Sequence, residues 1–263
     1  MRPDIADLRA FYASRQGQLT RRLVNTQLRQ LWPDLAGRTL AGIGYPLPFL
    51  GMFDEAAAVA ALLTADMAQA AGEDEANGCV VVGHEEDLPF ADGSVDRVLL
   101  AHALETSPKV KRLMREVWRV LADGGRLVAL VPNRRGVWCW SERTPFGMGQ
   151  PYSAGQLERT LRSHLFEPTA MRRALYLPPT RWRLPLRFAI PVERLGLRLA
   201  PQLAGVVLVE AEKRLYVPAP VAAGKRAARR GYVAVPQRAL AESAFDPAAA
   251  LSPSADAPAP PSR

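Results

Sequence analysis

The sequence predicts an α/β fold, a doubly wound and mostly parallel sheet covered by helices. Three observations support this. Short apolar runs alternate with helical patterns over residues 39–215, as in strands joined by crossover helices. The 263 residues are 48% hydrophobic, enough for one core and a small second lobe. A helical stretch precedes this region and a tail rich in Ala, Pro and Ser follows it, so we expect one α/β domain with additions at both ends.

An N-terminal helical arm is expected over residues 1–36. Apolar side chains recur at helical intervals within residues 4–32, and Asp4 and Asp7 suit the positive end of a helix dipole. Gly37 then interrupts the pattern. The periodic positions are Leu8, Phe11, Tyr12, Leu19, Leu23, Leu28 and Leu31.

The α/β domain is expected over residues 37–216, with strands at 39–44, 60–65, 79–83, 97–102, 127–132, 168–176 and 206–215. A helix at 109–122 ends before two glycines, which suit a helix C-cap. A second helix at 153–164 begins with a polar start that resembles a capping box. An insert at 177–204, rich in Pro, Arg and Leu, separates the last two strands.

The formal net charge of +8 is concentrated in the last third of the chain. Residues 1–170 contain 19 basic and 20 acidic residues, whereas residues 171–263 contain 15 and 6. The tail at 217–263 opens with a basic cluster at 225–230 and continues into Ala, Pro and Ser. So few large apolar residues cannot offset the entropy of ordering, and we expect the tail to be largely disordered.

Two cysteines, Cys79 and Cys139, are too few for a disulfide framework and fit a reducing compartment. The N-terminus lacks an apolar signal core, and no apolar stretch reaches the roughly 18 residues needed to span a bilayer. We therefore expect a cytoplasmic protein. The three histidines share no ligand spacing, so we expect no metal.

Three segments in a fixed order carry the strongest signal. Residues 39–46 form a strand that runs into a turn with Gly42 and Gly44, where glycine allows a tight turn and a close approach to a ligand. Residues 85–98 read EEDLPFADGSVDRV, and residues 113–127 read LMREVWRVLADGGRL.

Together these segments resemble the class I S-adenosylmethionine-dependent methyltransferases, in the group that reads LPF-x-D-x-S-F-D and then E-x-x-R-V-L-x-P-G-G. The resemblance implies a seven-stranded, Rossmann-like methyltransferase fold. It also implies S-adenosylmethionine as cofactor, bound across the carboxyl ends of the first strands where the strand order reverses.

Carried over position by position, the resemblance implies cofactor contacts from the glycine turn, from an acid after the second strand that binds the ribose, and from the segment that meets the adenine. These residues are Gly42, Gly44, Asp66, His84, Glu85 and Leu88.

The sequence departs from the family pattern at three of the related positions. Leu40 stands where an acid is usual and cannot accept a hydrogen bond from the cofactor's ammonium group. Pro46 stands at the third glycine, where it removes a backbone donor and adds bulk. His84 takes the place of the adenine-side acid, with Glu85 and Glu86 next to it.

Methyl transfer depends on alignment more than on a fixed catalytic triad, so the catalytic residue is open. His102, after the fourth strand, is a candidate general base, and a purely structural histidine is the alternative. Asn133, after the fifth strand, could orient a polar acceptor, and Arg134 or Arg135 an acidic one. The alternative for this segment is a solvated basic loop.

We expect methyl transfer from S-adenosylmethionine to an unidentified acceptor, such as a small molecule. The alternative is a catalytically inactive methyltransferase-fold binding or scaffold protein that associates with anionic membrane surfaces through its basic C-terminal third. In the insert, residues 181–188 interleave arginine with Trp, Leu and Phe, which suits a membrane surface, a pocket for an acidic acceptor or a solvated face. No motif indicates specific nucleic-acid binding.

Overall fold

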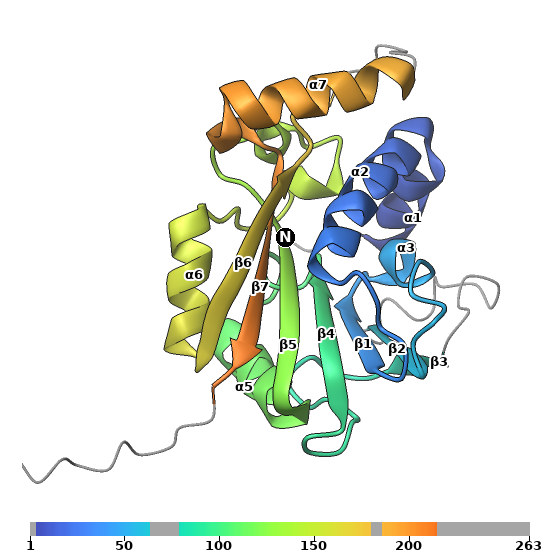
Figure 1. The fold of residues 1–263 in the computed structure, drawn as a ribbon, viewed down its shortest axis with the longest axis vertical. Helices are drawn as coiled ribbons and strands as arrows, with labels where there is room; N and C mark the ends of the chain where they lie inside the picture. The colour runs from blue at the N-terminus through green and yellow to red at the C-terminus, as the bar shows by residue number, and fades with distance from the viewer. Residues whose placement is uncertain (1–3, 64–78, 180–185, 215–263) are drawn as a thin grey trace, which may run out of the picture. The chain divides into compact units, whose positions relative to one another are not determined.

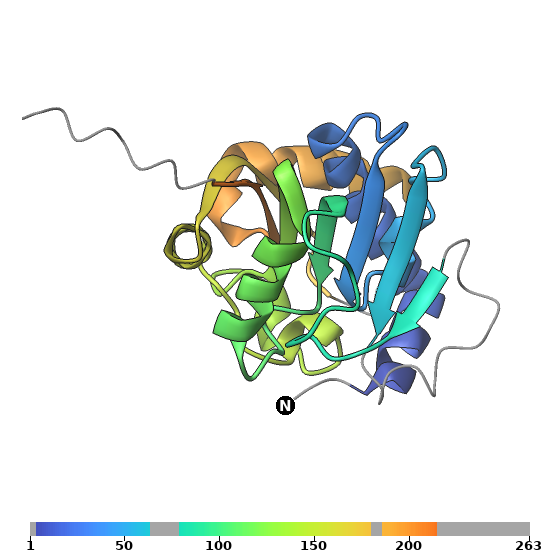
Figure 2. The same ribbon diagram turned by 90° about the horizontal axis from the view of Figure 1, so that it is seen from below.

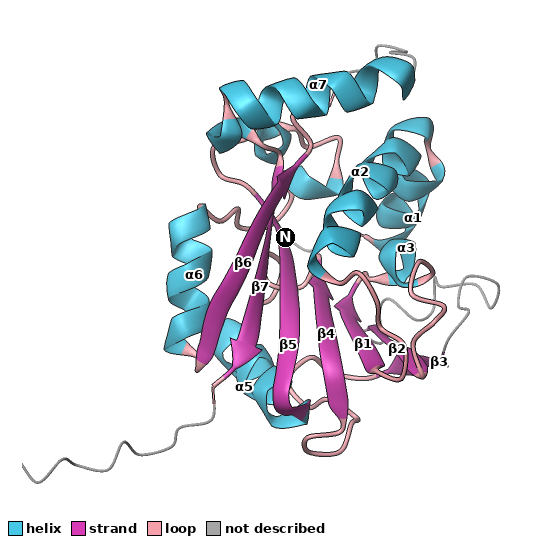
Figure 3. Cartoon of the chain, in the orientation of Figure 1, coloured by secondary structure: helices cyan, strands magenta, loops and turns pink. Residues whose placement is uncertain are grey.

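The computed structural model describes residues 4–63, 79–179 and 186–214. Seven strands form one sheet in the order β3-β2-β1-β4-β5-β7-β6 (Figures 1 and 3). The strands are β1 (Thr39–Gly44), β2 (Ala58–Leu63), β3 (Cys79–Val82), β4 (Val95–Ala101), β5 (Leu121–Pro132), β6 (Phe166–Ala174) and β7 (Val206–Lys213).

The first five strands are parallel, and β7 runs antiparallel to both β5 and β6. The predicted fold class, a mostly parallel seven-stranded Rossmann-like sheet, is confirmed. Strand order reverses between β1 and β4, because β1 leads to β2 and β3 on one side and β4 to β5 on the other. Ligands of such sheets bind at the carboxyl ends of the strands beside this reversal.

Successive side chains along each strand point to opposite faces of the sheet, so the core has two layers. In β4, Val98 and Leu100 face one layer, whereas Leu99 and Ala101 face the other. The first layer holds α5 (Val110–Val120) and α6 (Ala154–Ser163), and the second holds the N-terminal helices. The central strands are buried on both faces, which explains their continuous apolar runs. Figure 2 shows α5 against one side of the twisted sheet.

The N-terminal arm consists of two helices, α1 (Ile5–Ala13) and α2 (Arg15–Leu31), instead of the single pattern expected from the sequence. Ser14 separates them and caps α2, because its hydroxyl accepts a hydrogen bond from the Gly17 amide at 3.1 Å. A side chain at Gly17 would lie 1.9 Å from the Phe11 carbonyl oxygen, so only glycine permits this tight corner.

A buried hydrogen bond joins the end of α2 to β7, the last strand in the chain. The indole nitrogen of Trp32 donates to the Glu210 carboxylate at 3.0 Å, and both residues are buried. Glu210 also accepts from the Thr169 hydroxyl at 2.8 Å and lies 3.6 Å from Arg126. These partners satisfy a carboxylate that would otherwise be costly to bury.

The predicted segments match the structure most closely at β1 and α6. The capping box expected for α6 is present, formed by Ser153 and Gln156. The insert between β6 and β7 contains α7 (Leu186–Leu199) and the short 3₁₀ helix η4 (Pro201–Leu203). The predictions for Asp66, residues 181–185 and the tail after residue 214 fall outside the described residues.

Candidate functional site

The turn after β1 adopts the tight geometry that its glycines predict. Gly44 has a φ of +93°, and a side chain there would lie 2.3 Å from the Ala101 carbonyl oxygen at the end of β4. That carbonyl accepts a hydrogen bond from the Tyr45 amide at 2.7 Å. The ends of β1 and β4 are therefore in direct backbone contact, and Gly44 is required by both conformation and space.

Gly42 allows Pro46 and Leu50 to pack closely against β1. A side chain at this position would lie 2.5 Å from Cβ of Pro46 and 3.0 Å from a methyl of Leu50. The proline that replaces the third glycine of the family pattern therefore folds back onto the first one. Leu40, at the position of the family acid, is buried in the core.

The arm covers this turn. Figure 1 shows α1, α2 and the short α3 (Leu47–Leu50) gathered beyond the upper ends of β1 and β4. The buried rings of Tyr12 and Tyr45 stack with their centroids 5.9 Å apart. A cleft of about 240 Å³ lies beside them, lined by these rings and by residues including Arg21 and Leu47.

Three buried polar side chains meet at the carboxyl end of β4. The Tyr12 hydroxyl lies 2.8 Å from Nε2 of His102, and Nδ1 of His102 lies 3.2 Å from Glu105 Oε1. The exposed fractions of Tyr12, His102 and Glu105 are 7%, 1% and 3%. Because a carboxylate only accepts, we place the imidazole proton on Nδ1, and the Tyr12 hydroxyl then donates to Nε2.

This cluster has the marks of a strained and polarised site. His102 is one of three non-glycine residues with positive φ in the described ranges, at +54°. The 3.2 Å contact from Nδ1 of His102 falls outside hydrogen-bond geometry, and no other described residue donates to either carboxylate oxygen of Glu105. Burial, and then the nearby charge of Glu105, raises the pKa of Tyr12 well above its usual range. The Tyr12 phenol therefore stays protonated, and the Glu105 charge is unsatisfied except by His102.

The segment expected near the adenine lies at the ends of β2 and β3. His84 is exposed, whereas Glu85 is buried and accepts from the Ser107 hydroxyl at 2.9 Å. Leu88 is buried in the layer of α5. Glu85 and Leu88 therefore face the interior at this end of the sheet, and His84 does not.

The spacing of the third motif has a structural cause in this chain. Arg119 on α5 donates to the carbonyls of Leu88 and Phe90 at 2.8 and 2.9 Å and to Asp92 at 2.6 Å. Glu116 accepts from the Leu88 amide at 3.2 Å, and its bond with Arg119 lowers its pKa. The Glu-x-x-Arg pair thus fixes the Leu-Pro-Phe segment in place.

Asn133 lies after β5 and is buried in a backbone network. Its Nδ2 donates to the carbonyls of Gln202 and Ala204 at 2.9 and 2.7 Å, and its Oδ1 accepts from the Arg135 amide at 3.3 Å. These bonds attach the loop after β5 to η4. An acceptor could bind the Asn133 amide only by displacing them.

The described residues suit S-adenosylmethionine through their acids more than through their glycines. Pro46 occupies the space over Gly42, so no open cradle exists there. Glu105, by contrast, is a buried carboxylate with unsatisfied oxygens at the carboxyl end of β4, which suits a cationic sulfonium or ammonium group. Glu85 adds a second buried acid at the ends of β2 and β3.

A family model described as "Methyltransferase domain" matches residues 41–129, a third of the chain that includes β1, β4 and the Leu-Pro-Phe segment. Residues 41–129 are thus similar to a methyltransferase domain. The match contains both glycines of the turn, His102 and Glu105.

Curated relatives resemble parts of this chain. The ubiquinone/menaquinone biosynthesis C-methyltransferase UbiE of Rhizobium meliloti is 41% identical over 56 residues, which are 21% of this chain and 22% of that protein. The demethylmenaquinone methyltransferase of Thermus thermophilus is 31% identical over 102 residues, 37% of this chain and 46% of that protein. The chain thus spans less than half the length of these relatives.

Solved structures show that the likeness in fold extends over most of the chain. A possible histamine N-methyltransferase from Thermotoga maritima matches with a TM-score of 0.56 at 16% identity, over 80% of this chain and 96% of that one. The cyclase SpnF matches with a TM-score of 0.53 at 20% identity, over 77% and 84%. At such identities only the fold is shared, and a cyclase among the neighbours illustrates that fold alone does not define a reaction.

The sequence analysis missed Tyr12 and Glu105 as site residues. Tyr12 is 90 positions from His102, and no spacing connects them. Glu105 had a usable signal, since it follows His102 by three residues in a loop after a buried strand. In the described ranges, no three His, Cys, Asp or Glu side chains could hold a metal, and no helix is long and apolar enough to cross a membrane.

Proposed function

We propose that the protein transfers the methyl group of S-adenosylmethionine to an acceptor that binds at the carboxyl ends of β4 and β5. The observation that carries this proposal is the buried Tyr12–His102–Glu105 cluster beside the glycine turn. The family match to residues 41–129 supports the same reaction class. Bound there, the cofactor supplies an electrophilic methyl group.

The proposed roles follow from charge and position. Glu105 and Glu85 favour a cationic ligand, and Leu88 gives the same end of the site an apolar wall. His102 takes the acceptor's proton through Nε2 after its hydrogen bond with Tyr12 opens, while Glu105 holds the proton on Nδ1 and stabilises the resulting imidazolium. The glycine turn positions the strand ends and does not cradle the ligand at Gly42.

Calorimetric titration of the full chain with S-adenosylmethionine and S-adenosylhomocysteine tests the proposal. We expect both to bind, and Glu105→Gln to weaken S-adenosylmethionine roughly tenfold, because a charge-assisted contact is lost. Glu86→Gln is the matched control, since Glu86 pairs with Lys109 and Arg112 at the surface. Because enzymes commonly have KM values of about 1 mM or below, the absence of binding at roughly millimolar ligand would refute the proposal.

A second candidate is a methyltransferase-fold binding protein without catalysis. It is favoured by Pro46 packed over Gly42 and by the buried Leu40 at the position of the family acid. The same titration separates the two candidates, because a pure binding protein of this kind would ignore both ligands. If this binding protein acts at a membrane, the full chain should sediment with anionic vesicles, and a chain without residues 215–263 should not.

A further inference from the structure

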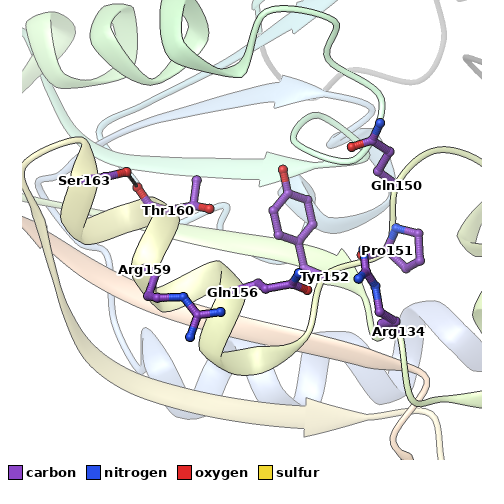
Figure 4. A pocket seen from close by; sticks show the side chains of 8 residues that line it. All are labelled: Arg134, Gln150, Pro151, Tyr152, Gln156, Arg159, Thr160 and Ser163. Atoms are coloured by element: carbon purple, nitrogen blue, oxygen red, sulfur yellow. Dashed lines mark hydrogen bonds between the residues drawn. The ribbon is translucent and has the colours of Figure 1, made fainter.

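A second cleft, of about 420 Å³, opens beside the end of β5 (Figure 4). One wall is the polar face of α6, where Gln156, Arg159, Thr160 and Ser163 follow the i, i+3, i+4, i+7 spacing of one helix face. Leu157 and Leu161 of the same helix are buried against the sheet. The cleft therefore has the size of a small-molecule site and a wholly polar helical wall.

The opposite wall is held by backbone hydrogen bonds. The Arg134 amide donates to the Tyr152 carbonyl at 3.0 Å, and the Tyr152 amide donates to the Pro132 carbonyl at 3.0 Å. Nε of Arg134 donates to the Pro151 carbonyl at 3.3 Å, which directs the guanidinium along this wall. Arg134 is thus positioned before any ligand arrives, which reduces the entropy cost of binding.

The charged side chains that line the cleft are both positive, and neither has an acidic partner among the described residues. No carboxylate lines it, and among residues 4–63, 79–179 and 186–214 none lies within 4 Å of the charged nitrogens of Arg134 or Arg159. The acid nearest in sequence to Arg159, Glu158, pairs instead with Arg162 at 3.5 Å. The Arg159 guanidinium lies over the first turn of α6, where a side chain at Gly155 would come within 3.7 Å of Nη1.

The cleft also adjoins the buried cluster of the proposed site. The Gln150 amide donates to the Glu105 carbonyl at 2.8 Å, and Tyr152 is close enough to Glu105 for its charge to raise the tyrosine pKa, after the larger effect of burial. The Tyr152 phenol is therefore a donor at neutral pH. Gln150 and Tyr152 thus connect the wall of the cleft to Glu105.

We propose that Arg134 and Arg159 bind the anionic group, phosphate or carboxylate, of the methyl acceptor. That the ligand is the acceptor rests on the proposed function, whereas anion binding by the cleft does not. A guanidinium group suits the oxygen geometry of both anions, and the hydroxyls of Tyr152 and Thr160 line the same cleft as further donors. The remaining volume of the cleft accommodates the organic part of the molecule.

Calorimetry with 1-naphthyl phosphate, 1-naphthoate and neutral 1-naphthol tests the proposal on the full chain. Both anions should bind and naphthol should bind at least tenfold more weakly, with anion affinity falling as salt is added. Arg134→Gln and Arg159→Gln should each weaken the anions roughly tenfold. Arg162→Gln removes the same charge from the same helix outside the cleft, and should leave the affinities unchanged.

Equal binding of naphthol, equal loss in Arg162→Gln, or no binding of either anion would overturn the proposal. Sedimentation with phosphatidylglycerol vesicles that is lost in the Arg134→Gln/Arg159→Gln variant would assign the arginines to a lipid surface and overturn the small-molecule site. If the anions bind but S-adenosylmethionine does not, the proposed function is refuted, and so is the identity of the anion as the methyl acceptor. If S-adenosylmethionine binds but the anions do not, only the inference about the cleft is refuted.

Discussion

Replacing Tyr12 by phenylalanine isolates the hydrogen bond that joins the arm to the end of β4. The ring keeps its neighbours, because its contacts with Phe11 and Phe49, at centroid distances of 5.1 and 5.6 Å, do not involve the hydroxyl. What changes is the 2.8 Å bond to Nε2 of His102. His102 is 1% exposed, so no water replaces the lost donor.

The expected cost is about 2 kcal/mol. Removing one partner of a buried hydrogen bond so that the acceptor stays unsatisfied costs about 1–3 kcal/mol. Urea unfolding of the wild type and Tyr12→Phe should show a midpoint lowered by about 0.7–2 M with an unchanged slope. An altered slope would indicate a change in compactness instead of a lost bond.

A double-mutant cycle with His102→Asn provides the control. Asparagine tolerates the positive φ of this position, so the variant removes the imidazole without new backbone strain. The coupling energy between Tyr12→Phe and His102→Asn should reach at least about 1 kcal/mol. A coupling below about 0.3 kcal/mol, the scatter of independent sites, would refute the bond as a stabilising contact.

Two further predictions concern stability. Hydrogen bonds from Arg29 lower the pKa of Glu55 from 4.5 to about 2, so Glu55→Gln should lower the free energy of unfolding by about 1 kcal/mol at neutral pH. Because the folded-state pKa is depressed, the difference from wild type in chemical unfolding should vanish as the pH falls from 4.5 towards 2. A difference that stays constant with pH would contradict this prediction. Gly44→Ala should cost about 2–5 kcal/mol in urea unfolding, since it combines positive φ with a 2.3 Å backbone clash. Gly37→Ala is the control, because Gly37 also has a positive φ, +71°, but open space around it, and the free energy of unfolding should fall by only about 1 kcal/mol. Equal losses of stability in the two variants would show that the structure relieves the clash at residue 44.

The sheet was predictable because its strands are apolar runs that end in glycine or polar residues. β1 was expected at its observed bounds, whereas β5 begins six residues before its expected start. There the sequence Asp123-Gly124-Gly125 was interpreted as a helix end, but Leu121 pairs with Val95 and the strand continues through an irregularity. Local propensity did not reveal this pairing, which is long-range.

The site was predictable only where its residues follow strand ends in a known order. His102 and the glycine turn were assigned as candidates in this way. The partner of His102 comes from α1, and its position depends on how the arm turns at Ser14 and Gly17, which hydrophobic periodicity does not specify. The sequence predicted α6 and its capping box, but the role of its polar face as a wall requires Arg134 from another segment.

The bond between Trp32 and Glu210 has a consequence for synthesis of the chain. The two residues are 178 positions apart, so Trp32 leaves the ribosome long before its partner exists. At about 5–20 residues per second, the interval is roughly 10–40 s. During that time the apolar face of α2 has no β7 to meet, and the newly made arm presents a surface that chaperones recognise. Slower translation between β1 and β7 should therefore lower the yield of folded protein more than slower translation of the arm itself.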